Sequence, residues 1–372
     1  MKKVLEQYEL ELTAAGPVYI GSGKEIGKKE YAFSPWEKQI RVMDMAKLCQ
    51  LLNQKKLMSQ YEKFILGNSR DDLGKWLEKN HVSRQEYQNC VRYRLGCQDA
   101  VIDSRSKLAV LEFVKDAYGM PYVPGSSVKG MLRTMLLAYD IACDSGKYKG
   151  VKRDISGALS RNQRKNRTVC RMESAAMEQA CYRTLHRLEK VPNHAVNDRM
   201  AGMTVSDSEP LSMEDLVLCQ RTELHTDGKE KKLNVLREVL RPETVIRTSL
   251  TIDSDICGIT KEYLEEAMTY FGEMYYECFL KKYPDMDRPS QDMVWLGGGT
   301  GFVTKTEVYP LFGREEGLET TVNIFKATGV PDNHKHFSDR KLGVSPHICK
   351  VTYYEGKRYQ MGLCHAKITK CR

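Results

Sequence analysis

The segment at residues 124–130, Pro-Gly-Ser-Ser-Val-Lys-Gly, restricts the fold of this chain more than any other. Pro124 and Gly125 end the preceding segment, and the apolar side chains that follow recur at helical spacing. These apolar residues are Val128, Met131, Leu132, Met135, Leu136 and Tyr139. The pattern predicts an amphipathic helix from Ser126 to about Ile141, with Ser126 or Ser127 as its N-cap.

Two cations lie near the start of this helix. Lys129 and Arg133 are four residues apart, so they share one helical face. Together with the free backbone N–H groups of the first turn, they could hold a phosphate group. The alternative is a capped core helix with two solvated cations, which is a common arrangement.

Two glycine clusters accompany the helix. Gly297, Gly298, Gly299, Thr300 and Gly301 follow a helical segment and precede a run at 302–309 that is typical of a strand. So many glycines let the backbone approach a nucleic acid or a packed neighbouring element very closely. The second cluster consists of Gly21, Ser22, Gly23 and Lys24, expected as a loop after the first strand. Neither cluster has the spacing of a P-loop or of a dinucleotide-binding fold.

The charge of the chain suits a polyanionic partner. Its formal net charge is +9, and nine Lys or Arg residues against one acid lie between residues 147 and 171. We expect residues 144–171 to form a mobile basic loop in which Arg164, Lys165 and Arg167 contact RNA. A solvated insertion without RNA contacts is the alternative.

The remaining pattern predicts an α+β fold. A strand near residues 8–12 and a helical stretch at 45–97 precede the helix; a strand at 203–207, a hairpin at 216–240, a strand at 244–252 and a helix at 263–278 follow. The hairpin turns at Asp227-Gly228 and carries Lys229, Lys231 and Lys232 at its tip. Without insertions, the order is that of a ferredoxin-like (RRM-like) βαββαβ core.

This order implies a division of the chain. Residues 1–309 form the core, with a helical insertion at 45–97 and the basic loop at 144–171. Residues 310–372 form a C-terminal extension packed on the core, with a strand pair near 348–354 and 358–364.

Three motifs together resemble one family. Residues 121–133 are similar to the helix signature of the RAMP superfamily, the ferredoxin-like RNA-binding proteins of CRISPR effector complexes. Residues 297–302 resemble the Gly-rich loop of that family, and residues 19–23 its first loop. The length, the helical insertion and the segments 205–208 and 236–243 most resemble the fifth Csm subunit of type III-A systems. That family is implicated in capping the complex at the crRNA 3′ end and in crRNA maturation.

The resemblance implies partners and a role. The expected partners are crRNA, other Csm subunits, especially a neighbouring backbone RAMP subunit, and ribonucleases of the host. RNA-cleaving backbone subunits carry an Asp before a Ser-Pro in their first long loop, whereas Phe33 precedes Ser34-Pro35 here. We therefore expect a non-catalytic crRNA-binding subunit. The alternatives are an endoribonuclease that trims pre-crRNA and a purely structural cap held by protein contacts.

No catalytic residue, metal or cofactor is expected from the sequence. Twelve cysteines are scattered without a C-x-x-C, and no metalloprotease, hydrolase or paired-Asp motif occurs. His334 and His336 could chelate a metal weakly, but we interpret them as loop histidines. Without an apolar run long enough to cross a membrane or a signal peptide, a cytoplasmic location is expected.

Residues from all these segments are candidates for RNA binding. They are Gly21, Ser22, Gly23, Lys24, Ser126, Ser127, Lys129, Arg133, Arg164, Lys165, Arg167, Lys229, Lys231, Lys232, Gly297, Gly298, Gly299, Thr300, Gly301 and Lys305.

Overall fold

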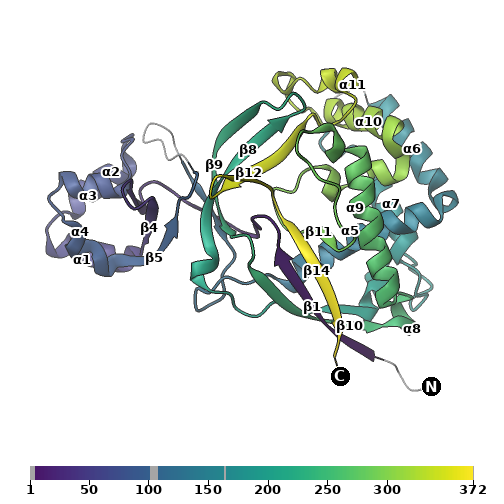
Figure 1. The fold of residues 1–372 in the computed structure, drawn as a ribbon, viewed down its shortest axis with the longest axis horizontal. Helices are drawn as coiled ribbons and strands as arrows, with labels where there is room; N and C mark the ends of the chain where they lie inside the picture. Colours follow the sequence, from purple (N-terminus) through teal and green to yellow (C-terminus); the bar gives the residue numbers. More distant parts are fainter. Residues whose placement is uncertain (1–4, 101–107, 163–164, 372) are drawn as a thin grey trace.

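The computed structural model describes residues 5–100, 108–162 and 165–371, so the candidate Arg164 lies outside the described residues. It is an α+β fold built on two sheets, with helices gathered on one side and a small helical lobe projecting on the other (Figure 1). This confirms the predicted α+β class. None of the helices in the described ranges is long and apolar enough to cross a membrane.

The first sheet has five strands and brings both ends of the chain together. In β1 the side chains alternate, with Leu10 and Leu12 fully buried between outward-facing glutamates. The strand order is β11 (Met293–Trp295), β14 (Leu363–Lys370), β1 (Leu5–Ala14), β10 (Val245–Asp253) and β7 (Met203–Val205). Strand β14 pairs with β1 from Cys364 to Lys370, so the last strand belongs to the same sheet as the first. The predicted boundary at 309/310 therefore cuts through one sheet.

The second sheet has nine strands and contains the predicted hairpin. Strands β8 (Leu216–His225) and β9 (Glu230–Leu240) pair antiparallel across the turn at Asp227-Gly228, which confirms that prediction. Its other strands are β2 (Gly21–Ile26), β3 (Tyr31–Ser34), β4 (Gln39–Met43), β5 (Val91–Gly96), β6 (Val110–Phe113), β12 (Ile348–Tyr354) and β13 (Lys357–Gln360). Strand β12 pairs with β8, so it joins the hairpin to the C-terminal segment.

Two long helices and several shorter ones form the helical side. Helices α5 (Gly125–Cys143) and α9 (Lys261–Cys278) contact each other, and the apolar stripe predicted for α5 is buried at Val128, Leu132 and Leu136. The others are α6 (Lys149–Arg161), α7 (Arg171–Tyr182), α8 (Ser254–Cys257), α10 (Val308–Thr328) and α11 (Asp339–Leu342).

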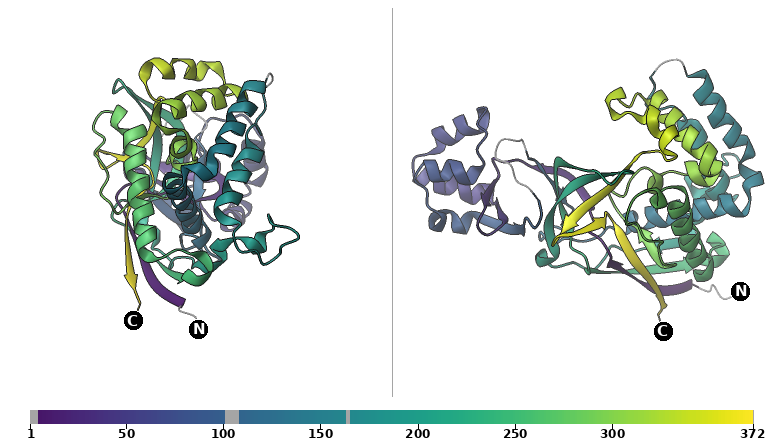
Figure 2. Two further views of the ribbon diagram at one scale, coloured as in Figure 1. Left: turned by 90° about the vertical axis from the view of Figure 1, so that its right-hand side faces the viewer. Right: turned by 45° about the horizontal axis from the view of Figure 1, so that its top comes forward.

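A separate small lobe holds most of the helical insertion predicted at 45–97, but its end was predicted wrongly, because residues 91–96 form strand β5 of the second sheet. It consists of α1 (Met45–Gln54), α2 (Met58–Leu66), α3 (Leu73–Lys79) and α4 (Arg84–Tyr87), and it projects away from the two sheets (Figure 2). Its own core includes Phe64 stacked on Trp76, with ring centres 5.3 Å apart. The lobe buries its apolar side chains in a cluster of its own.

Three other local predictions were wrong. The basic segment is largely helical, because Ile155 is buried on α6 and Val151 and Leu159 pack beside it at helical spacing. Residues 302–309 form a 3-10 turn and the start of α10 instead of a strand. Residues 21–24 begin strand β2, where Gly23 has φ +82° at an irregularity in the pairing with β6. In each case tertiary contacts overrode the local signal.

Candidate nucleic-acid interface

The Gly-rich loop packs on the segment that follows β1. The N–H of Gly298 donates to the carbonyl of Tyr19 at 2.7 Å, and a Cβ on Gly297 would lie 2.3 Å from that same oxygen. Gly297, Gly299 and Gly301 all have positive φ. The glycines are therefore required for close approach to a neighbouring element, which is one of the two roles predicted. A Cβ on Gly301 would meet no described atom within 4 Å, so this glycine faces open space.

A cluster of three cations lies beside this loop. A Cβ on Gly299 would lie 3.1 Å from Nη1 of Arg237, which projects from β9. Arg221 on β8 and Lys350 on β12 complete the cluster, and each is partly buried. Burial, together with Arg221 and Arg237, lowers the pKa of Lys350 to about 8. The strand registers agree with this placement, because Lys350 lies opposite Glu223 and Arg237 opposite Cys219, each two residues from Arg221.

The protein supplies little negative charge to this cluster. Nη2 of Arg221 donates to Glu223 at 3.0 Å, which is the one ion pair that a described residue makes with any of the three cations. Nε and Nη1 of Arg237 and Nε of Arg221 are buried without a hydrogen-bond partner in the described part of the chain. Buried guanidinium N–H groups without partners are costly, and an anion would satisfy them.

An aromatic ring lies at the edge of the cluster. The guanidinium carbon of Arg237 is 5.1 Å from the ring centre of Tyr19, a cation–π distance. Tyr19 is partly exposed, so its ring is available both to Arg237 and to a ligand outside. Sequence analysis missed the three cations, because they come from three strands that pair only in the folded sheet.

The start of α5 differs from its prediction. Neither Ser126 nor Ser127 caps the helix; the N-cap is Pro124, and the N–H of Gly125 donates to Oδ1 of Asp207 at 2.8 Å. A carboxylate from a distant segment thus occupies one position that a phosphate would take. Lys129 donates to the carbonyls of Met200 and Met203, at 2.8 and 2.6 Å. Its phosphate contact stays a prediction, and the structure gives its ammonium a structural role.

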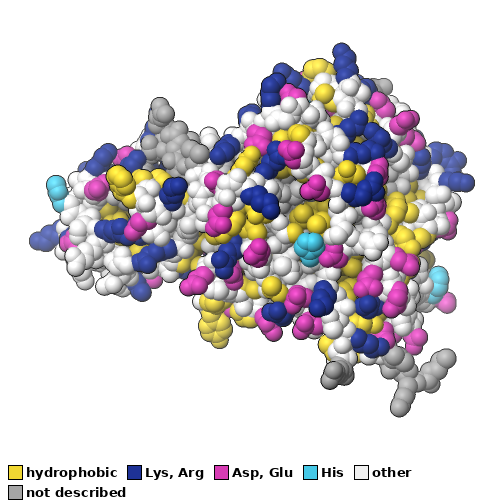
Figure 3. Space-filling model, in the orientation of Figure 1, with side chains coloured by type: hydrophobic (Ala, Val, Ile, Leu, Met, Phe, Trp, Pro, Cys, Tyr) yellow, Lys and Arg dark blue, Asp and Glu magenta, His cyan; other side chains and the backbone are white. Residues whose placement is uncertain are grey.

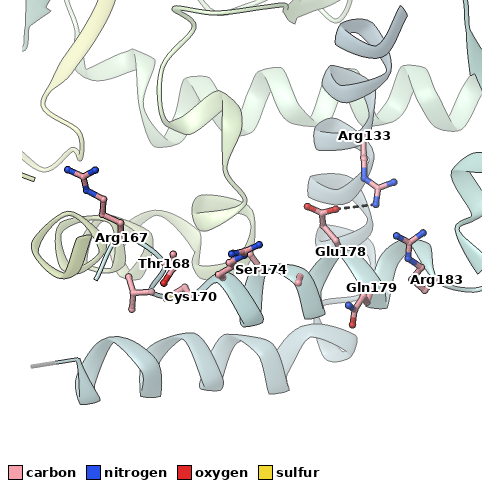
Figure 4. Close-up of a pocket in the computed structure, with 11 residues that line it drawn as sticks. Arg133, Arg167, Thr168, Cys170, Ser174, Glu178, Gln179 and Arg183 are labelled. Atoms are coloured by element: carbon pink, nitrogen blue, oxygen red, sulfur yellow. Dashed lines mark hydrogen bonds and ion pairs between the residues drawn. The ribbon is translucent and has the colours of Figure 1, made fainter. Parts of the chain in front are cut away.

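Arg133 lines a pocket of about 690 Å³ between α5 and α7 (Figure 4). It forms ion pairs with Glu178 and Asp198, each at 3.1 Å, so its charge is balanced within the protein. Arg167 and Arg171 line the same pocket and make no ion pair with any described residue. Arg133 and Arg167, which the sequence placed in different motifs, therefore line one pocket, at its two ends (Figure 4).

A smaller cavity of about 280 Å³ lies next to this pocket and reaches the end of the Gly-rich loop. Lys305 and Glu307 line it together with Arg133. Glu307 is buried, its Oε2 has no hydrogen-bond partner among the described residues, and burial raises its pKa well above the usual value.

The other candidates are dispersed. Lys229 pairs with Asp227 at the exposed hairpin tip, and Lys232 lies over the ring of Tyr353 at 5.7 Å. Lys165 packs against Gly329, at the end of α10. Ser22 donates to Glu112 on β6 at 3.2 Å, away from the Gly-rich loop. On the face drawn in Figure 3, acidic and basic side chains are interspersed, so no single basic stripe marks that face.

The fold and these motifs define a class of protein, and comparison of the chain with known protein families identifies that class. Residues 11–304 match the family model of the RAMP superfamily. The chain belongs to this superfamily.

Individual proteins of similar sequence indicate which branch of the superfamily this chain resembles. The chain is 28% identical over its whole length to the whole of a Mycobacterium tuberculosis protein named "CRISPR system Cms protein Csm5". It is 25% identical to a Streptococcus thermophilus protein of the same name, covering 86% of this chain and 84% of that one. The predicted resemblance to the fifth Csm subunit is thereby confirmed.

Solved structures share the fold. One chain of a cryo-EM structure of a type III-A Csm–crRNA–target RNA ternary complex has a TM-score of 0.63 at 19% identity, covering 97% of this chain and 100% of that one. The crystal structure of T. onnurineus Csm5 has a TM-score of 0.58 at 17% identity, covering 95% and 99%.

Proposed function

We propose that this chain is a crRNA-binding subunit of a type III-A Csm effector complex and that it does not cleave RNA. One observation carries the proposal: buried guanidinium N–H groups of Arg221 and Arg237 lack partners, among the described residues, beside the Gly-rich loop. The names of the full-length relatives support it, as does the fold shared with a chain of a Csm–crRNA–target RNA complex.

The proposed binding mode is electrostatic. Arg221, Arg237 and Lys350 hold one or two backbone phosphates, and the open space at Gly301 allows the RNA backbone close to the loop. Phosphate contacts carry no sequence information, so binding is largely independent of RNA sequence and falls steeply with salt. The ring of Tyr19 is placed to stack on a base at the same point.

The ferredoxin-like core is part of the proposal. The elements β1, α5, β7, β10, α9 and β11 follow the βαββαβ order along the chain. Within the sheet, β1 lies beside β10 and β10 beside β7, as that core requires, while β14 is inserted between β1 and β11. In this arrangement the Gly-rich loop follows the last core strand.

The position in the complex follows from the family. We place the subunit at the crRNA 3′ end, next to a backbone RAMP subunit, where it caps the complex and supports crRNA maturation by ribonucleases of the host. The lysines at the hairpin tip, Lys229, Lys231 and Lys232, are exposed and suited to contact RNA or that neighbour.

The cavity at Glu307 favours one second candidate, an endoribonuclease that trims pre-crRNA. A buried carboxyl with a raised pKa, in the same cavity as Lys305, is typical of a general acid. The purified chain is therefore incubated with labelled crRNA, with and without Mg²⁺. The proposed function expects salt-sensitive binding and unchanged RNA length. Shortening that Glu307→Gln abolishes would establish the nuclease instead, and negligible binding would leave a purely structural cap.

A further inference from the structure

Two histidines and an aspartate converge between α10 and β12. Nδ1 of His347 lies 2.6 Å from Oδ1 of Asp339, and Nδ1 of His336 lies 3.1 Å from Oδ2 of the same carboxylate. The three side chains offer ligand atoms that all lie within 4.8 Å of one another. No second group of three such side chains, this close together, was found in the residues that the structure describes.

The cluster is shielded from solvent. Asp339 is fully buried and His347 is 7% exposed. Asp339 also accepts from Oγ of Ser345 at 2.6 Å, which fixes the orientation of the carboxylate. A carboxylate and two imidazoles in a shielded site form a ligand set suited to a transition-metal ion.

Further imidazoles surround this set. The ring centre of His225, at the end of β8, is 5.8 Å from that of His347, and His334 stacks on His336 at 6.1 Å. The ring of Phe325 packs on His336 at 4.4 Å and forms an apolar wall. Four of the eight histidines of the chain thus gather in one place, although they come from three separate segments.

We propose that His336, Asp339 and His347 bind one divalent transition-metal ion, with zinc as the best match. Each imidazole would coordinate through Nδ1, with its proton on Nε2, and Asp339 would supply one oxygen. Zinc bonds of about 2.0–2.2 Å place tetrahedral ligand atoms about 3.3–3.6 Å apart, so the N–O pairs, now separated by 2.6 and 3.1 Å, would move slightly apart around the ion. Small side-chain rotations complete the geometry, and a water molecule or His225 supplies the fourth ligand.

The ion would stabilise the fold by joining two segments of the chain. His336 and Asp339 belong to the segment after α10, whereas His347 directly precedes β12, which pairs with β8 of the hairpin. Coordination would therefore fasten the C-terminal helical segment to the sheet that carries Arg221 and Lys350. The proposal does not depend on RNA binding, because its ligands lie outside the cation cluster.

The first test measures bound metal directly. The full chain is saturated with ZnCl₂, dialysed against metal-free buffer and analysed by mass spectrometry for zinc. We expect about one zinc per chain, and zinc should raise the melting temperature by about 5 °C. The double variant His336→Gln/His347→Gln should lose both effects, while the matched control His186→Gln/His194→Gln, at two exposed histidines, should keep them. Zinc retained by the first variant would overturn the proposal.

The second test needs no variant, so it holds even if the variant fails to fold. Cobalt(II) is added to the wild-type chain, and its absorption spectrum is recorded. Intense visible bands of a tetrahedral ion without a thiolate charge-transfer band are expected for His and Asp ligands. A thiolate band would assign the metal to the cysteines, and no binding would show that the cluster is held by hydrogen bonds alone; either result rejects the site.

Discussion

Arg237 on β9 lies over the ring of Tyr19, with its guanidinium carbon 5.1 Å from the ring centre, although the two residues are far apart in the sequence. The Gly-rich loop closes over both, since Gly298 binds the backbone of Tyr19 and Gly299 leaves room for Arg237. This contact joins the first loop, the hairpin and the Gly-rich loop at one point. It is the centre of the proposed RNA site.

Removing the two arginines should weaken RNA binding. Arg221→Gln with Arg237→Gln takes away two partly buried cations, whose buried N–H groups include some without a partner among the described residues. The slope of log K against log salt should become shallower by about one for each phosphate that the variant no longer binds. Fluorescence anisotropy with labelled crRNA at several salt concentrations measures the slope. Lys63→Gln, at an exposed lysine of α2, is the control, and an equal effect of both changes would reject the site.

RNA binding should depend on pH through Lys350. Its pKa of about 8 means that the free protein loses this charge as the pH rises through 8. A bound phosphate favours the ammonium, so affinity should fall between about pH 7.5 and 9, by up to about tenfold per pH unit. Lys350→Met should bind more weakly at pH 7 and lose this part of the pH dependence. Identical pH profiles for both proteins would contradict the prediction.

The same lysine should affect stability with the opposite sign. Because its pKa is lower in the folded protein than in the unfolded chain, the unfolded chain binds more protons between these two values. Stability should therefore rise with pH above 8, and the rise should be smaller in Lys350→Met. Urea unfolding at a series of pH values measures this difference.

A side chain in the Gly-rich loop should disturb both packing and binding. Gly299 has φ +92°, and a Cβ there would lie 3.1 Å from Arg237. Gly299→Val should lower the melting temperature and reduce RNA affinity more than a change at the exposed Lys335 does. Gly157→Ala, inside α6 with only ordinary contacts, is the matched glycine control and should not destabilise. Equal small effects at all three positions would count against the proposed packing role.

Lys129 should act mainly on stability. Its ammonium donates to two carbonyls of the segment before and at β7, so Lys129→Met leaves those acceptors without this donor. The expected cost is on the order of 1 kcal/mol, measured by urea unfolding. The stability of Arg133→Gln is measured for comparison, because Arg133 forms ion pairs instead of bonds to carbonyls and lines an open pocket. Unchanged stability with a shallower salt slope would return Lys129 to the phosphate role that the sequence predicts.

The hairpin tip should affect assembly rather than folding. Shortening it from Thr226 to Lys232 would remove residues that pair with β8, since Lys231 and Lys232 lie opposite Glu223 and Thr222. Replacing Lys229, Lys231 and Lys232 by Ser keeps the strands and removes the charge. We expect normal stability but less incorporation into a reconstituted Csm complex, or a shifted crRNA length. Normal incorporation with unchanged lengths would make the hairpin an ordinary surface element.

Local sequence determined the parts whose contacts are local. The apolar stripe of α5, the hairpin at Asp227-Gly228, the helical insertion and the alternation in β1 are each visible from short stretches of the chain. The order of the motifs along the chain also supported the family resemblance, because this order is read directly from the sequence without the folded structure. The basic segment was misjudged, since three apolar residues among many cations were enough to anchor α6 against the core.

Tertiary structure decided the rest. The sequence could not place Arg221, Arg237 and Lys350 together, because each belongs to a different strand and strand pairing brings together residues that are distant in the chain. The sequence likewise could not place Asp207 at the start of α5 or His225 beside His347. Burial then lowered the pKa values of Arg237 and Lys350, since a charge removed from water acquires a shifted pKa or requires a partner that only the fold can supply.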